Sequence, residues 1–174
     1  MPLRFIIISF LLLSFNITSN GQSPGIQELE KRNGFKDIKL GMVVDSIKGV
    51  KFKKDIKHNE IYPAKLYSVE NPEYEKIGEV KVTDVEVKAY NSLVYEISIV
   101  AEKDPRLMKA LESIYGKSDY DLKNQLYFWR GDNILLKFQG SGKHHLEMLY
   151  ISNSVIKMMK VDKDKKVEDI ANDF

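Results

Sequence analysis

The sequence predicts an α+β domain: an antiparallel sheet of about five to six strands, with helices packed on one face and two helix-plus-meander units. Two observations lead to this class. Short segments of alternating apolar and polar residues follow one another with only turn residues between them, which is typical of antiparallel strands. Two groups of such segments are each preceded by a helical pattern, so the chain repeats a helix and a meander.

The first residues have the layout of a secretory signal peptide. Arg4 supplies a short positive region, and the apolar run after it is too short to span a bilayer, which needs about 20 apolar residues. Ser19 and Gly21 are small residues at the −3 and −1 positions of a cleavage site. We therefore expect residues 1–21 to be removed by a cut between Gly21 and Gln22, and the protein to be periplasmic or secreted. The alternative is a core helix or an uncleaved anchor. No cysteine follows the cut, so a lipid anchor there is excluded.

Composition narrows the classes of function. The absence of cysteine excludes disulfide bonds, thiolate zinc sites and cysteine nucleophiles. The 27 basic and 25 acidic residues nearly cancel, so charge gives no reason to expect nucleic acid or an anionic membrane as a partner.

Patterning along the chain predicts a flexible leader over 22–34, a single α+β domain over 35–160 and a charged tail over 161–174. Within that tail, apolar residues fall at i, i+3, i+4 and i+7, which suits an amphipathic helix: Val167, Ile170, Ala171 and Phe174.

The first part of the domain is the hardest to interpret. Alternation predicts a short strand over 35–40, and residues 42–50 suit a two-turn helix. Residues 51–78 are polar, with a short strand expected over 66–69. Residues 38–48 resemble the strand, Leu-Gly-Met and short-helix opening of many small exported bacterial domains, such as the outer-membrane assembly lipoproteins.

A change of parity marks the start of the β core. Val80 and Val82 occupy even positions, whereas Val85 and Val87 occupy odd ones. Because successive side chains of a strand alternate between faces, this segment is not one regular strand with one buried face. Either a bulge at Thr83-Asp84 restores the face or a tight turn there makes two strands. We favour the bulge, because Thr-Asp without glycine is a poor two-residue turn. The strand after it is expected to carry one apolar face: Leu93, Tyr95, Ile97 and Ile99.

The clearest helix follows that strand. Asp104 is expected to cap it, Pro105 suits its first position, and Gly116 suits its end. Its apolar residues fall at helical spacing: Leu107, Met108, Leu111, Ile114 and Tyr115.

Three more strands are predicted by alternation and by the turn residues between them: Leu126–Arg130, Ile134–Phe138 and Leu146–Tyr150. A final helix is expected to begin at Asn153 or Ser154 and to pack three apolar residues on the sheet: Val155, Ile156 and Met159. This order of elements resembles that of the tandem helix-and-sheet β-lactamase inhibitor proteins, a likeness of fold order that does not fix function.

Candidate ligands for a metal are few. His144 and His145 are adjacent, so in a strand they point to opposite faces, whereas His58 and Glu60 would share a face in an extended segment. The pattern favours exposed polar residues near turns, and we predict no metal site, no cofactor site and no catalytic residue. The tripeptide Arg130–Asp132 spells an integrin-binding motif, but its residues are also typical of a hairpin turn.

Aromatic residues are the one enrichment that suggests a site. Tyr127 and Trp129 share one side of a predicted strand, and Phe128 lies on the other. An exposed Tyr/Trp pair on a sheet suits a partner protein or a ligand ring, so Tyr127 and Trp129 are a possible interaction surface. The alternative is that a helix or the tail covers this side of the strand.

The second half of the chain carries a resemblance. It has a helix ending in Tyr-Gly, an aromatic strand with tryptophan, a hairpin, a tyrosine strand and a charged tail that ends in Asp-Phe. The residues concerned are Tyr115–Lys117, Tyr127–Arg130, Ile134–Phe138, Leu149–Tyr150 and Asn172–Phe174. The pattern resembles an uncharacterised family of small exported proteins of Gram-negative bacteria. The resemblance implies export and a compact α+β fold, and it supplies no activity.

These observations favour a non-enzymatic binding or interaction protein of the periplasm or cell exterior, acting on an unknown protein or small ligand. Two alternatives stay open. One is an inhibitor or immunity-type protein that docks on an enzyme, and the other is a small hydrolase whose active-site residues are dispersed in the sequence. The oligomeric state is not predicted.

Overall fold

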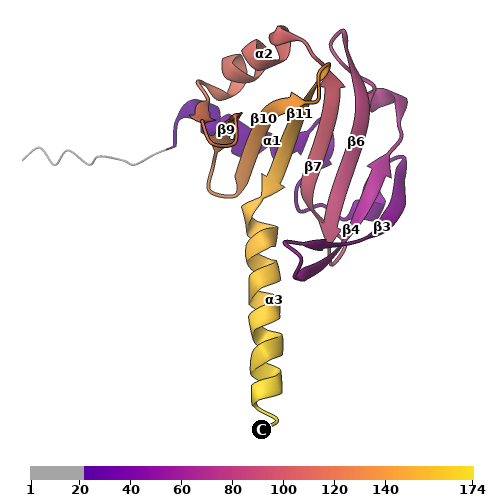
Figure 1. Ribbon diagram of the computed structural model, residues 1–174, viewed down its shortest axis with the longest axis vertical. Helices are drawn as coiled ribbons and strands as arrows, with labels where there is room; N and C mark the ends of the chain where they lie inside the picture. Colours follow the sequence, from indigo (N-terminus) through magenta and orange to yellow (C-terminus); the bar gives the residue numbers. More distant parts are fainter. Residues whose placement is uncertain (1–21) are drawn as a thin grey trace, which may run out of the picture.

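The computed structural model describes residues 22–174, and the predicted signal peptide with its cut after Gly21 lies outside the described residues. Within 22–174, a nine-stranded sheet is accompanied by three α-helices and a two-stranded ribbon (Figure 1). Every strand pairing there is antiparallel. The α+β class with an antiparallel sheet is therefore confirmed, whereas the predicted number of strands is too low.

The two halves of the chain each build one half of the sheet. The first half contains α1 (Pro24–Arg32), β1 (Gly34–Phe35), β2 (Ile38–Lys39), the 3-10 turn η1 (Val44–Ser46), β3 (Val50–His58), β4 (Tyr62–Val69), the 3-10 turn η2 (Pro72–Tyr74), β5 (Lys76–Ile77), β6 (Val80–Tyr90) and β7 (Leu93–Glu102). The second half contains α2 (Pro105–Tyr115), β8 (Asp119–Asp121), β9 (Leu126–Arg130), β10 (Ile134–Ser141), β11 (His145–Ser152) and α3 (Asn153–Ala171). The strand order is β3-β4-β6-β7-β11-β10-β9-β8, with β5 paired to β6, so the last strands of the two halves meet at the centre.

The strands that sequence patterning missed are edge strands or very short ones. β3 lies at one edge and is exposed along most of its length, so no alternation of apolar and polar residues is selected there. The strand predicted over 66–69 is the second half of β4. β5 and β8 have only two and three residues, too few to show a period.

The segment that precedes β3 departs from both predictions made for it. Residues 35–40 form the ribbon of β1 and β2 instead of one strand, because Lys36 adopts a positive φ of 51° and the chain reverses there. The two-turn helix predicted over 42–50 is reduced to the three-residue turn η1.

β6 is one continuous strand with a bulge at the parity change. Its pairing with β7 shifts register between Val82 and Asp84, and the Thr83 hydroxyl donates to the Val100 carbonyl at 3.1 Å. The predicted bulge is therefore confirmed. It lets the valines on both sides of it face the same core.

A second register shift, between Lys88 and Ala89, changes the N-terminal end of β7. Val94, instead of Tyr95, packs with Ile97 in the main core, and Tyr95 joins a second apolar cluster. The single face predicted from Leu93 to Ile99 is therefore wrong at its N-terminal end. Alternation cannot reveal a bulge whose extra residue is itself apolar.

Helices α1 and α2 pack against each other and on one face of the sheet. Leu29 of α1 is fully buried in the same core as Leu111 of α2 and Ile97 of β7. Most of the segment predicted as a flexible leader, 22–34, is therefore this helix. We call the face beneath α1 and α2 the covered face.

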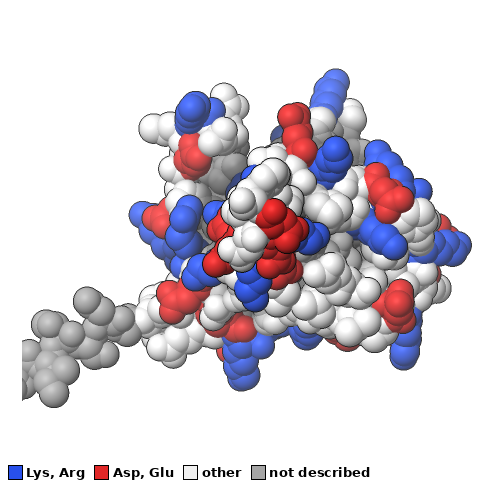
Figure 2. Space-filling model, turned by 90° about the horizontal axis from the view of Figure 1, so that it is seen from below, with Lys and Arg blue, Asp and Glu red and all other residues white. Residues whose placement is uncertain are grey.

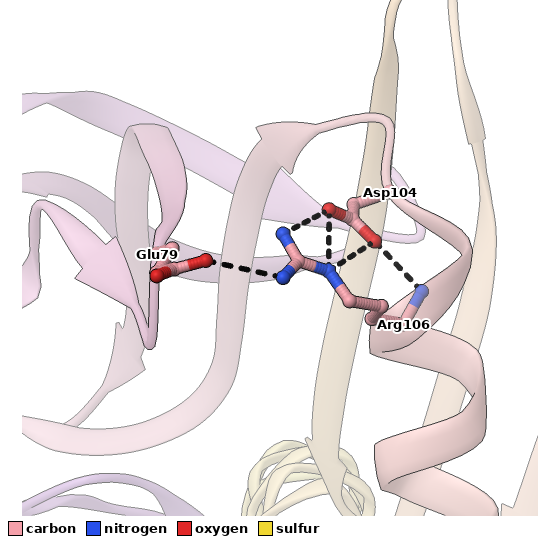
Figure 3. Close-up of polar contacts among 3 residues, drawn as sticks. All are labelled: Glu79, Asp104 and Arg106. Carbon is pink, nitrogen blue, oxygen red and sulfur yellow. Dashed lines mark hydrogen bonds and ion pairs between the residues drawn. The ribbon is translucent and has the colours of Figure 1, made fainter.

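The N-terminus of α2 is capped as predicted. The Asp104 carboxylate accepts from the Arg106 backbone N–H at 2.8 Å and also binds the Arg106 guanidinium (Figure 3). The same guanidinium reaches Glu79, between β5 and β6, at 3.2 Å. Hydrogen bonds from Arg106 lower the pKa of Asp104 below its ordinary value. Arg106 therefore links the N-terminus of α2 to the turn between β5 and β6.

The last helix, α3, behaves differently from α1 and α2. Its first turns bury Val155 and Met159 in the second apolar cluster, with Tyr90, Tyr95 and Ala64, and Ile156 packs against that cluster. The predicted packing of these helix residues is confirmed. However, α3 then runs away from the sheet as a single projecting rod (Figure 1), so it does not lie over a face as α1 and α2 do.

Candidate functional site

Tyr127 and Trp129 differ in how far their side chains are exposed. Trp129 is 1% exposed, its ring meets Tyr115 of α2 edge-on at 6.3 Å, and its indole N–H donates to the Gly116 carbonyl at 2.8 Å. Tyr127 is 40% exposed and stacks at a tilt on Tyr120 at 4.7 Å. The end of α2 covers the tryptophan, so the alternative of a covering helix holds for Trp129, and Tyr127 is the exposed member of the pair.

The other side of the sheet carries no helix over most of its width. Register places the outward residues of neighbouring strands in two rows, one containing Ser98, Leu149, Lys137 and Phe128, and the next containing Glu96, Ile151, Leu135 and Arg130. We call these eight residues, with Val100, Glu147 and Gln139 in the following row, the open face. Apart from the buried Glu96 and the exposed Arg130, all of them are half-buried. The side chains of the open face are therefore less exposed than those of a solvated surface and more exposed than those of the core.

Polar groups on the open face hold one another in fixed positions. The Ser98 hydroxyl donates to one Glu147 carboxylate oxygen at 2.7 Å, and the Gln139 amide donates to the other at 2.8 Å. Lys88 of β6 pairs with Glu96 at 2.6 Å. These contacts join four neighbouring strands, β6, β7, β11 and β10, and hold the side chains in fixed orientations. Such preorganisation reduces the entropy lost on binding.

One end of the open face is hollowed. A depression of about 680 Å³ is lined by Tyr120, Asp121, Asn124, Leu126, Phe128, Arg130, Leu135, Lys137 and Gln139. The Arg130 guanidinium lies 5.5 Å from the centre of the Phe128 ring, as in a cation–π contact. Within residues 22–174, neither Arg130 nor Lys137 forms an ion pair within 4.0 Å. The hollow therefore combines three apolar side chains, those of Leu126, Phe128 and Leu135, with these two cations and with the Asp121 carboxylate. Hydrogen bonds from Asn124, with a smaller effect from Lys137, lower the pKa of Asp121 below its ordinary value.

The opposite end of this face is closed by α3. Leu66 shares the face of Glu96 through the register of β4, β6 and β7, and Ala64 lies two residues before it on the same side. The first turns of α3 pack on Ala64 and Tyr95. The His58 ring lies edge-on to Tyr95 at 5.2 Å, and burial lowers the pKa of His58 below its ordinary value. The second cluster thus bounds the open face.

The histidines do not assemble with acidic residues into a larger group. His145 lies opposite Glu102 at the end of β11, and His144 is exposed in the turn before it. In the described part of the chain, no three histidine or carboxylate side chains gather as a metal ion would require. No helix of residues 22–174 has both the length and the apolar composition needed to cross a bilayer.

Comparisons with known proteins returned no match, whether to family models, to curated proteins or to solved structures.

Sequence reasoning missed the open face for a physical reason. Its positions alternate with the core positions, and they mix charged with apolar residues, as many solvated faces do. Of its apolar residues, only Phe128 is placed on the outer side of its strand by the sequence pattern. The register between β9 and β10 that brings Leu135 and Lys137 beside Phe128 and Arg130 is not visible in the sequence.

Proposed function

We propose that this chain is a non-enzymatic binding protein of the periplasm or cell exterior that docks a partner protein on its open face. The observation that carries the proposal is the hollow at Phe128, Arg130, Leu135 and Lys137. Export is supported by the signal-peptide layout that ends at Gly21.

The composition of the open face suits a protein partner. Interfaces combine a half-buried apolar centre with a polar rim, and aromatic residues and arginine are enriched in them. Here Phe128, Leu135 and Leu149 are the apolar centre, and the Glu147 carboxylate in the next row is held by Ser98 and Gln139. The unpaired cations of the hollow favour a partner that presents a carboxylate beside an apolar side chain, since such a group satisfies both.

A pull-down from an envelope fraction tests the proposal with matched variants. The double variant Arg130→Glu with Lys137→Glu reverses the charge of the hollow. The control, Lys109→Glu with Lys117→Glu, makes the same change on exposed residues of α2 and the turn after it. We expect the wild type and the control to recover the same partner and the open-face variant to lose it. No partner above background, or equal recovery by both variants, would contradict the proposal.

The identity of the recovered partner separates the binding protein from its nearest alternative. If the partner is an enzyme and its activity falls when this chain is added, the protein is of the inhibitor or immunity type. If the partner is a structural or transport protein of the envelope, the first proposal stands. Sequencing the N-terminus of the chain recovered from the envelope tests export separately, because cleavage predicts a first residue of Gln22.

A further inference from the structure

A cavity separate from the hollow of the open face lies beside α2, on the covered face. Its volume is about 380 Å³, and pockets that bind small molecules typically have about 300–1,000 Å³. The end of α1, the ribbon of β1 and β2, β5, α2 and β11 all contribute to its lining, so we call it the ribbon cavity. It shares no lining residue with the hollow.

Much of the ribbon cavity is apolar. Six large apolar side chains line it: Phe35, Ile77, Leu107, Leu111, Ile114 and Met148. Four of them belong to the main core, whereas Ile77 is half-buried and Ile114 is 37% exposed. The exposed Ala110 of α2 also lines the cavity. The apolar lining therefore extends from the core to the surface, where a ligand can enter.

Every polar side chain in the lining can donate a hydrogen bond, and none of the described lining residues is acidic. The polar side chains belong to four basic residues and two tyrosines: Arg32, Lys36, Lys39, Lys76, Tyr115 and Tyr150. Burial raises the pKa of both tyrosines above the ordinary value, so their hydroxyls stay protonated at neutral pH. On the face drawn in Figure 2, basic and acidic side chains are interspersed. A lining that contains cations alone is therefore a local feature.

Backbone carbonyls hold two of these cations in place. The Lys36 ammonium donates to the carbonyls of Glu73 and Lys76, and the Lys39 ammonium donates to those of Arg32 and Lys36. An ammonium has three N–H groups, so each of the two keeps one for a ligand. Cations that are fixed in this way lose less entropy when they bind an anion.

Neighbouring carboxylates do not balance the charge of the lining. Within residues 22–174, Glu28 is the one carboxylate within 4.0 Å of the four cations, and it binds Arg32 at 2.7 Å. Asp37 instead accepts from the Tyr74 hydroxyl at 2.8 Å. Glu79 binds the guanidinium at the N-terminus of α2 at 3.2 Å. The three lysines of the lining therefore lack a carboxylate partner.

We propose that the ribbon cavity binds a carboxylate that carries an aliphatic chain, with a medium-chain fatty acid as its occupant. The chain lies against the apolar lining, and the carboxylate accepts from the exposed ammonium groups of Lys36 and Lys76. A cationic ligand with the same chain would be repelled by the four bases. The inference adds a small-molecule site to a chain whose docking surface lies on the other face of the sheet.

Isothermal titration calorimetry of the chain from Gln22 to Phe174 with sodium decanoate tests the proposal. We expect one site per chain and a dissociation constant in the micromolar range. Decyltrimethylammonium has the same chain and the opposite charge, and acetate has the carboxylate without the chain, so neither should bind measurably. No binding of decanoate, or equal binding of decanoate and decyltrimethylammonium, would overturn the proposal.

Matched variants locate the site. Ala110→Phe fills the cavity from the exposed side of α2, whereas the control Ser113→Phe adds the same ring to an exposed position of α2 outside the lining. It should abolish decanoate binding. Lys76→Glu reverses one cation of the lining, and Lys109→Glu makes the same change on α2 away from it. Lys76→Glu should weaken binding about fivefold. Both controls should bind as the wild type does.

The open-face variant Arg130→Glu with Lys137→Glu separates this site from the hollow, because it should bind decanoate as the wild type does. Thermal melting shows whether Ala110→Phe is folded, and if it is not, Lys76→Glu decides. Unchanged binding by a folded Ala110→Phe or by Lys76→Glu would refute the site, and so would loss of binding in the open-face variant alone.

Discussion

At the scale of single residues, the two aromatic side chains of β9 show how position decides between core and surface. Tyr127 and Trp129 lie on the same side of one strand, yet only the tryptophan lies beneath the last turn of α2. Its indole N–H satisfies the Gly116 carbonyl, just past the helix end. Trp129 therefore contributes to stability by locking a helix end to the sheet.

Replacing Trp129 with phenylalanine should lower the free energy of unfolding by about 2 kcal/mol, because the change removes buried volume and leaves the Gly116 carbonyl without its donor. Tyr127→Phe is the matched control, since it removes only a hydroxyl from a partly exposed ring. Urea denaturation measures both. Equal losses in the two variants would mean that the tryptophan is no more important than its exposed neighbour.

His58 gives a second prediction at this scale, which concerns pH. Burial, with a smaller effect from Lys88, lowers the pKa of His58 below its ordinary value of 6.5, although Glu96 acts in the opposite direction. As the pH falls through 6.5, the unfolded chain takes up this proton before the folded one does, so stability should fall on acidification. His58→Gln should flatten the slope of stability against pH just below neutrality, and the control His144→Gln should not. An unchanged slope for His58→Gln would show that the histidine does not titrate in this way.

At the scale of elements, a helix or strand could be predicted from the sequence where local residues determine it, and could not where distant contacts do. The bulge in β6 and the bounds of α2 were predictable, because the parity of valines and the residues Asp104, Pro105 and Gly116 act locally. The helix α1 was not, because its short charged sequence is held by contacts with α2 that are distant along the chain. The open face is likewise a product of register between strands, and no local pattern encodes it.

The contact between α1 and α2 can be tested at one glycine. A Cβ at Gly25 would lie 2.1 Å from the Tyr115 carbonyl oxygen, so Gly25→Ala must displace α1. We expect a loss of about 1–3 kcal/mol in the free energy of unfolding. Gly140→Ala is the control, because nothing lies within 4 Å of the added carbon there. If thermal melting shows the same small change for both, α1 does not depend on this close approach.

At the scale of the whole molecule, the two faces of the sheet differ in what covers them. The covered face is filled by α1 and α2 and holds the main core, so it determines stability. The open face is bounded by the second apolar cluster at one end and hollowed at the other, and its polar groups are bonded across strands. The projecting part of α3 leaves this face free, because the helix runs away from the sheet.

Site-directed photo-cross-linking tests the docking role of the open face most directly. Because the chain has no cysteine, a photoreactive maleimide can be placed on Lys137→Cys in the hollow or on Lys109→Cys on α2. After illumination in an envelope extract, we expect one discrete cross-linked partner from position 137 and none from position 109. The same products from both positions, or a partner captured only from position 109, would contradict the assignment of the open face as the binding surface.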